Sequence, residues 1–326
     1  MSNDLTERPP LEATPPSANH FVAPLEETPL LAIDVVKVAD KPSNLWIDAW
    51  RDARRRPIFW ISGFFIILVC VVALFPGLFT NVLPNNNCQL INSNGGPTAG
   101  HPLGFTKQGC DVYSRIINGT STSLSVGIIV IVLTTVLGIV FGAFAGFYGG
   151  VVDAFLSRIG DIFFSISYIL AAVVIMSVLV NYRSVWTISL AIGIFAWPAT
   201  ARVLRAEILR VKNSDFVMAS EALGVSSLRI LLRHVLPNSI APVIAITTIS
   251  LAAAIVAEAT LSFLGVGLGS SIMSWGNDIN QAQKDLRTNP QTLIYPSLAL
   301  SLTVFAFILM GEVIRDALDP KARALR

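Results

Sequence analysis

The chain has 326 residues, of which 53% are hydrophobic and only 13% are charged, with a formal net charge of +2. This composition is far from that of a soluble globular protein and indicates a chain that folds in a bilayer. Such a small net charge gives no reason to expect a nucleic-acid partner, and three cysteines are too few for a disulfide scaffold.

The amino-terminal segment, residues 1–50, is rich in proline and in acidic and small polar residues. It cannot bury enough apolar area to offset its chain entropy, so we expect a disordered tail. The segment also lacks a basic start followed directly by an apolar core, so it does not resemble a cleaved signal peptide. We therefore expect the tail to stay in the cytoplasm.

Six apolar segments follow, each of about the length that crosses a hydrocarbon core roughly 30 Å thick as a helix. Their apolar residues surround the helix rather than forming a stripe. An all-α membrane protein with about six transmembrane helices is therefore predicted. The segments are residues 58–80, 123–147, 162–180, 185–203, 239–264 and 293–311.

These spans divide the chain into a first transmembrane helix with an external loop (51–120), a transmembrane domain (121–312) and a carboxyl-terminal tail (313–326). The positive-inside rule places both termini in the cytoplasm, because Lys and Arg concentrate on one set of flanks. The external side then holds Lys107, Arg115, Arg183, Lys284 and Arg287. The cytoplasmic side holds Arg51, Arg54, Arg55, Arg56, Arg158, Arg202, Arg205, Arg210, Lys212, Arg229, Arg233, Arg315, Lys321, Arg323 and Arg326.

The external loop contains Cys88 and Cys110, in a compartment that permits disulfides. They form either a bridge, which would stabilise the loop by roughly 3 kcal/mol in the chain-entropy model, or two free thiols. In the second span, Gly138, Gly142 and Gly146 form successive GxxxG steps. We interpret them as a face for close helix packing, within the chain or between subunits, with a moving seam as the alternative.

Two further positions within spans are candidates for a transport pathway or for a structural role. Trp197 precedes Pro198, which removes one helical hydrogen bond and is expected to kink the fourth span. Glu258 is an acidic side chain well inside the fifth span, which makes it a functional candidate by default, with hydration or a partner in the bundle as the structural alternative.

The segment 205–237, between the fourth and fifth spans, is too long for a simple turn. It is predicted to form two helices separated at Gly224, with Asp215 as the first cap and Pro237 as the stop. A projecting element of this kind suits helix-in-groove docking to a soluble partner.

No catalytic, cofactor or metal site is predicted. The chain has no GxxxxGK[ST] phosphate loop, so it cannot bind ATP by the usual backbone cradle, and any ATP-driven motor must be another polypeptide. No predicted span contains a His or a GxGD-type aspartate, which argues against an intramembrane hydrolase. The histidines His20, His101 and His234 all lie outside the spans, which disfavours a metal route.

The loop resembles the signature of inner-membrane permeases of ATP-binding-cassette importers, which reads EAA, three residues, Gly, nine residues and Ile-x-Leu-Pro. The spacing is met, and Ala219, Gly224, Leu236 and Pro237 match, whereas Met218, Ser220 and His234 depart from the pattern. The resemblance implies that the loop is the coupling element that seats in a cleft of the ATPase. Its implied residues are Met218, Ala219, Ser220, Glu221, Ala222, Leu223, Gly224, His234, Leu236 and Pro237.

Blocks outside the loop look like the dipeptide and oligopeptide branch of that family, in its second permease subunit. They are HPLG from His101, GCDVYSR from Gly109, GFYGG from Gly146, AEATLSFLGVG from Ala257, SWGNDI from Ser274 and GEVIRDALDP from Gly311.

The resemblance implies a type I importer fold and a non-catalytic permease half in a prokaryotic cytoplasmic membrane. The implied partners are a homologous second permease, two ATPases that bind ATP and Mg²⁺, and an external binding protein that delivers peptide, with membrane lipid around them. A permease for nickel or another small solute of the same branch is the alternative. A passive scaffold would need no docking loop.

Overall fold

The structure is a computed structural model that describes residues 45–85 and 88–318. The regular elements of these two ranges are helices, with only two isolated β-bridges in the loop ahead of α3 (Val112–Tyr148). Residues 1–44 of the predicted tail, His20 and the basic residues Lys321, Arg323 and Arg326 lie outside the described ranges.

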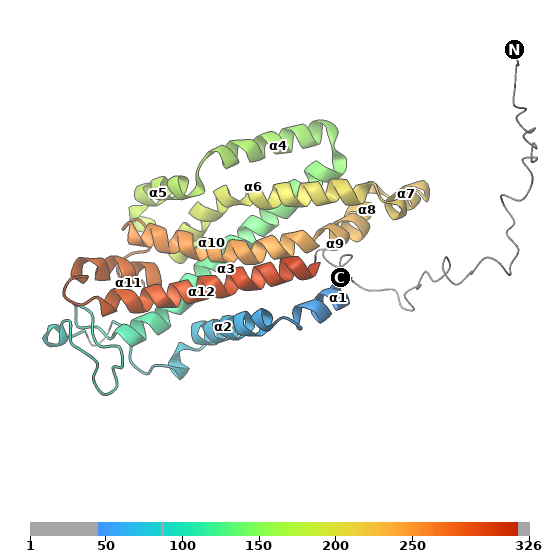
Figure 1. The fold of residues 1–326 in the computed structure, drawn as a ribbon. Coiled ribbons are helices and arrows are strands. Elements are labelled where there is room, and N and C mark those ends of the chain that lie inside the picture. The colour runs from blue at the N-terminus through green and yellow to red at the C-terminus, as the bar shows by residue number, and fades with distance from the viewer. Residues whose placement is uncertain (1–44, 86–87, 319–326) are drawn as a thin grey trace, which may run out of the picture. The chain divides into compact units, whose positions relative to one another are not determined.

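Five long helices form the body of the bundle, and their apolar windows are long enough to cross a membrane (Figure 1). A pair of shorter helices, bent relative to each other, gives a sixth span if it is counted as one. The prediction of an all-α membrane protein with about six spans is confirmed. The five helices are α2 (Pro57–Leu74), α3 (Val112–Tyr148), α6 (Val185–Lys212), α10 (Ala241–Phe263) and α12 (Gln291–Leu318).

The third predicted span, residues 162–180, is wrong as a single helix. The structure has α4 (Gly150–Ser165) and α5 (Tyr168–Val178), which are bent by 73° at Ile166 and Ser167. Neither residue is Gly or Pro, so nothing at the break signals it in the sequence. The start of α4 also differs, because Gly149 and Gly150 have φ of +67° and +53° and reverse the chain directly after α3.

Five other predicted boundaries need correction, the first being the end of the first span, since α2 ends at Leu74 and not at residue 80. The end of the predicted tail, residues 45–50, belongs to helix α1 (Leu45–Ala53). Helix α3 begins ahead of the predicted residue 123, because the Asp111 side chain caps it by accepting hydrogen bonds from two amides. Helix α6 continues past residue 203 to Lys212, and α12 continues past residue 311 to Leu318, within the predicted carboxyl-terminal tail.

The most extensive packing between two helices of the bundle joins α3 to α6, and the three glycines of the second span lie in this contact. A Cβ atom at Gly142 would lie 2.6 Å from the carbonyl oxygen of Ala201. At Gly138 it would lie 2.6 Å from Cβ of Thr200, and at Gly146 it would lie 2.9 Å from Ile208. The structure thus places all three glycines against a helix of the same chain, where any side chain would push the backbones apart.

The two ends of the bundle differ in what they carry (Figure 1). One end holds α1 and the short helices α7 (Asp215–Ala222), α8 (Ser227–Ile230) and α9 (Leu236–Ser239), and the other holds α11 (Trp275–Ala282) and the loop ahead of α3.

At the end that holds α1, Arg56 donates to Asp316 over 2.6 Å and to Asp52 over 3.0 Å. The hydrogen bond to Asp316 and the nearby carboxylates raise the pKa of Arg56.

Candidate functional site

The segment between α6 and α10 forms the projecting element that the sequence predicts. Helix α7 is followed by Gly224 with φ of +76°, then by α8, a π-helical turn over Leu231–Val235 and α9. Two helical stretches separated at Gly224 are therefore confirmed. A positive φ of this size is the conformation that glycine adopts at no steric cost.

Two details of the segment differ from the prediction. Ser214, not Asp215, occupies the cap position, and Asp215 is the first helical residue, where its charge still suits the positive end of the helix dipole. Pro237 does not stop the chain's helical course, since it lies in α9 directly after the π-helical turn. Proline is tolerated at the first turn of a helix, where its missing N–H is not needed.

One side of the element anchors it to the bundle. Val217 of α7 is 1% exposed, and Ile230, Leu231 and Val235 are also buried. These side chains form one apolar cluster with residues of α3 and α6, including Leu204. Burying four such side chains stabilises the position of the element by several kcal/mol, at about 1.5–3 kcal/mol each.

The other side of the element is an exposed apolar surface, which we call the docking face and define as Phe216, Met218, Leu223 and Leu228. Leu223, next to Gly224, is 83% exposed, and the other three are about half exposed. Four large apolar side chains exposed on one projecting element are more than the single exposed ones that are common on a protein surface, and they favour an interaction site. The docking face lies at the end of the bundle that holds α1 (Figure 1).

The ten residues implied by the family signature divide between these two sides. The docking side includes Ala219, Glu221 and Ala222, which are exposed beside Met218, Leu223 and Gly224. Ser220 is half-buried, and its hydroxyl donates to the carbonyl of Phe216 over 2.7 Å. In the second stretch, His234 and Leu236 are half-buried and Pro237 is exposed, with Leu236 packed against the buried cluster.

A pair of polar contacts, which the sequence did not indicate, clamps the base of the element. Arg205 of α6 donates two hydrogen bonds of 2.6 Å to the two carboxylate oxygens of Asp153 in α4. Lys212, at the end of α6, donates to the carbonyl of Phe147 in α3 over 2.5 Å. A bidentate Arg–carboxylate pair fixes geometry as well as adding energy. The element therefore projects from a junction at which α3, α4 and α6 are held together.

At the opposite end of the bundle, Glu258 is completely buried. Its carboxylate accepts hydrogen bonds from Ser262, over 2.8 Å, and from Ser123 of α3, over 3.2 Å. The Ser123 oxygen in turn accepts from the amide of Trp275 in α11, over 3.3 Å. Glu258 thus links α3, α10 and α11 through hydrogen bonds. These contacts fit the structural role in the helix bundle that the sequence offers as the alternative to a transport role.

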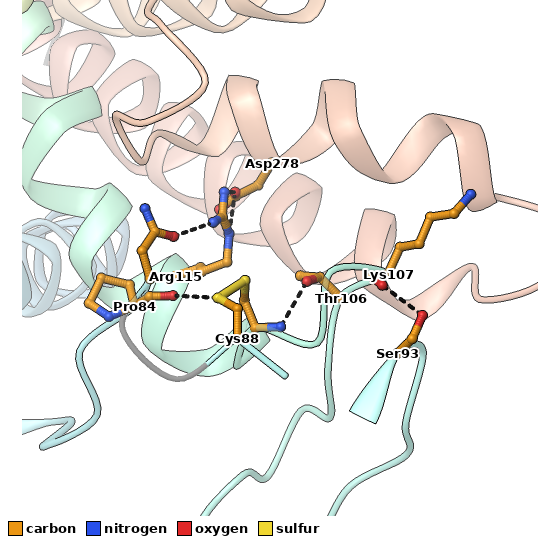
Figure 2. Close-up of a disulfide and its surroundings, with 9 residues drawn as sticks. Pro84, Cys88, Ser93, Thr106, Lys107, Arg115 and Asp278 are labelled. Atoms are coloured by element: carbon orange, nitrogen blue, oxygen red, sulfur yellow. Dashed lines mark hydrogen bonds and ion pairs between the residues drawn. A yellow bond between two sulfur atoms is a disulfide. The ribbon is translucent and has the colours of Figure 1, made fainter. Parts of the chain in front are cut away.

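A buried ion pair lies beside the disulfide loop (Figure 2). Arg115 of α3 donates from Nε to Asp278 of α11 over 2.8 Å and also from Nη2, and its Nη1 donates to Asn85 over 2.8 Å. Burial raises the pKa of Asp278, whereas Arg115 acts in the opposite direction. Cys88 and Cys110 form a disulfide with an S–S distance of 2.03 Å, which closes the loop over this pair.

The remaining pathway candidates lie where α6 faces α4. Trp197 is 3% exposed, and its ring lies 4.3 Å from that of Phe141 and 5.8 Å from that of Phe163, measured between centroids. Pro198 lies inside the continuous helix α6 and lines a cavity at the α4–α5 break. In residues 45–85 and 88–318, no three His, Cys, Asp or Glu side chains gather as a metal site.

Comparison with known proteins adds a family and a fold. Residues 138–324 match a family model described as a binding-protein-dependent transport system inner membrane component. Residues 44–96 match one described as the N-terminal TM domain of oligopeptide transport permease C.

Two curated relatives and one solved structure are similar along much of the chain. The chain is 34% identical to the glutathione transport system permease protein GsiD of Escherichia coli O6:K15:H31, covering 90% of this chain and 96% of that protein. It is 33% identical to GsiD of Pectobacterium atrosepticum, covering 86% and 92%. An inward-facing structure of the MetNI methionine ABC transporter matches with a TM-score of 0.52 at 20% identity, covering 63% of this chain and 96% of that chain. That likeness shows the type I importer fold.

Proposed function

Because this chain belongs to the family of binding-protein-dependent transport system inner membrane components, we propose that it is one permease half of an ATP-driven importer of short peptides. In this proposal the chain forms half of the pathway through the cytoplasmic membrane. The chemistry of ATP hydrolysis belongs to separate ATPase subunits, which bind ATP and Mg²⁺. The chain itself carries no catalytic residues.

The observation that carries the proposal is the docking face on a clamped element. A surface that transmits force must be exposed to its partner and also rigidly joined to the parts that move. The docking face offers Leu223 to a partner, while Val217 packs the element against α3 and α6, and the Arg205–Asp153 pair ties α6 to α4 at its base. A conformational change in the ATPase that contacts the face differently in its two states would then shift the bundle between its own states.

The substrate class is proposed from the similarity to the glutathione permease, since glutathione is a tripeptide-like solute. The partners are a homologous second permease, two ATPases and an external binding protein that delivers the solute. The docking face and both termini lie on the cytoplasmic side, and α11 and the disulfide loop lie on the external side, where the binding protein arrives.

The test is transport by the complete complex. The chain is co-expressed with the second permease, the two ATPases and the binding protein of the proposed complex, and the purified complex is reconstituted in proteoliposomes. Uptake of radiolabelled glutathione and trialanine is measured with ATP and with a non-hydrolysable ATP analogue. We expect uptake of at least one peptide with ATP alone. Uptake of nickel but of neither peptide, or peptide uptake independent of ATP, would overturn the proposal.

A further inference from the structure

A partly open cavity of about 360 Å³ lies at the break between α4 and α5 and is also lined by residues of α3, α6 and α10. Much of its wall is apolar or aromatic, with Phe164, Tyr168, Phe195 and Pro198 among the lining residues. None of the residues that line it is charged. Concave, mostly apolar sites with a few convergent polar groups are the usual form of small-molecule binding sites.

Among the described residues, four hydroxyl groups in the cavity wall have no hydrogen-bond partner, those of Ser167, Tyr168, Thr200 and Ser250, and the last two belong to α6 and α10. Thr200 is only 3% exposed, and Ser250 is half-buried. Ser and Thr side chains in helices commonly bond to a carbonyl of the preceding turn. Thr248 does so with Ile244 over 3.0 Å, and Thr134, in the same cavity wall, does so with Ile131 over 3.1 Å.

The direction of the Thr200 side chain follows from its packing. Its methyl group lies against α3, where a Cβ added at Gly138 would be 2.7 Å from Thr200 Cγ2. The hydroxyl therefore points away from that contact, and Thr200 is among the residues that line the cavity. The Thr200 side chain is thus largely buried, while its hydroxyl borders the cavity and has no partner among the described residues. An occupant of the cavity that accepts or donates a hydrogen bond would supply the missing partner.

The helix break adds backbone groups to the same cavity. Ile166 has an extended conformation with ψ of 123°, and α5 begins again at Tyr168. The first N–H groups of α5 have no intrahelical acceptor, and the Ser167 side chain does not cap them. They also carry the positive end of the helix dipole. In secondary transporters, discontinuous helices direct such ends toward anionic groups of the substrate.

We propose that this cavity is a transient binding site for the backbone of the transported peptide within the membrane. The hydroxyls of Thr200 and Ser250 bind its amide groups, and the amino-terminal end of α5 binds its terminal carboxylate. A hydroxyl both donates and accepts, so it serves the C=O and the N–H of any peptide bond. The site therefore accepts peptides without regard to their side chains. This inference rests on the proposed function.

The test measures binding of radiolabelled trialanine to the complete transporter in nanodiscs, without the external binding protein, so that the permease alone selects. Thr200→Val and Ser250→Ala remove one hydroxyl each at nearly constant shape. We expect each to weaken binding roughly threefold to tenfold, the range for one lost hydrogen bond. Thr248→Val, whose hydroxyl is already bonded within its own helix, is the matched control and should bind as the wild type does.

Two further measurements separate binding from folding and test the carboxylate. Thr200→Ser keeps the hydroxyl and should retain binding, while the ATPase rate and the thermal unfolding midpoint stay unchanged in all variants. Trialanine amide, which lacks the terminal carboxylate, should bind at least tenfold more weakly than trialanine.

Equal binding by the Thr200→Val, Ser250→Ala double variant and the wild type would overturn the inference, as would no trialanine binding to the wild type at millimolar concentration. In either case, ATP-dependent peptide uptake by the wild type would leave the proposed function standing. Absence of any peptide uptake by the wild type would instead refute the proposed function itself.

Discussion

Gly224 offers the sharpest test of how the projecting element transmits force. Its φ of +76° is a conformation that costs an ordinary L-residue about 1–2 kcal/mol. A Cβ atom added there would meet no atom within 4 Å, so the cost within this chain is backbone strain and not a clash. Asn adopts this conformation far more readily than other residues, whereas a β-branched residue is a genuine outlier there.

The matched pair is therefore Gly224→Val and Gly224→Asn. A strain of about 1–2 kcal/mol reduces the population of the native bend roughly fivefold to thirtyfold. The anchoring residues Val217 and Ile230 remain buried in both variants, and the spans satisfy their backbone hydrogen bonds internally, so both proteins should insert normally. What changes is the orientation of α7 and its docking face relative to α8.

The assay is the number of peptides imported per ATP hydrolysed, measured on one proteoliposome preparation for each variant. We expect Gly224→Asn to stay within about twofold of wild type and Gly224→Val to fall by fivefold or more, following the strain of about 1–2 kcal/mol. Wild-type coupling by the Val variant at equal abundance would refute the reasoning. Equal loss in both variants would show that contact with a side chain, and not the backbone angle, is what matters.

Three other outcomes follow from the structure. Gly142→Val should lower the unfolding midpoint and membrane abundance, because overpacking against α6 costs about 1–3 kcal/mol. Gly63→Ala, whose added Cβ would have its nearest contact at 3.4 Å, should lower neither. Equal unfolding curves for the two variants would contradict this reasoning. Intact-mass analysis after alkylation should find at most one alkyl group, on Cys70, until a reductant is added, because Cys88 and Cys110 are joined; three alkyl groups without reductant would contradict the disulfide. A cysteine at Ser226 should react with an impermeant reagent only after cells are opened; labelling of intact cells would reverse the topology.

The fold could be predicted in outline because long apolar segments have few alternatives. A segment such as 239–264 can cross lipid only if its backbone groups are hydrogen-bonded, and a helix provides these bonds within the segment. Helix α10 (Ala241–Phe263) therefore lies nearly where it was expected. The projecting element could also be predicted from the sequence, since Gly224 interrupts an amphipathic pattern. The family resemblance and the fold class were both confirmed.

The α4–α5 break escaped prediction because hydropathy averages over a window. Ile166 and Ser167 lie between apolar residues, and neither residue is a helix breaker. Helix α1 was missed for a related reason, since residues 45–50 adjoin a proline-rich tail whose composition dominated the interpretation.

The polar contacts could not be predicted from the sequence for a different reason, because they join residues that are close in space but distant in the chain. Arg115 and Asp278 are 163 residues apart in the chain. In the sequence, Arg115 looked like an ordinary external charge. The Arg205–Asp153 clamp is similar, since Asp153 carries no motif. For both pairs, the sequence indicated only a charged residue near an apolar span. Such a residue suggests a polar contact but does not identify the partner.

The central claim, that the docking face binds an ATPase, is tested most directly by crosslinking in the membrane. A photoreactive amino acid replaces Leu223, which is 83% exposed, and in a control chain it replaces Ser271, which lies in the segment between α10 and α11 at the opposite end of the bundle. Mass spectrometry identifies the products. The account predicts that Leu223 crosslinks to a protein with a GxxxxGK[ST] phosphate loop and that Ser271 does not. Crosslinking of Leu223 only to lipid or to other copies of this chain would contradict it.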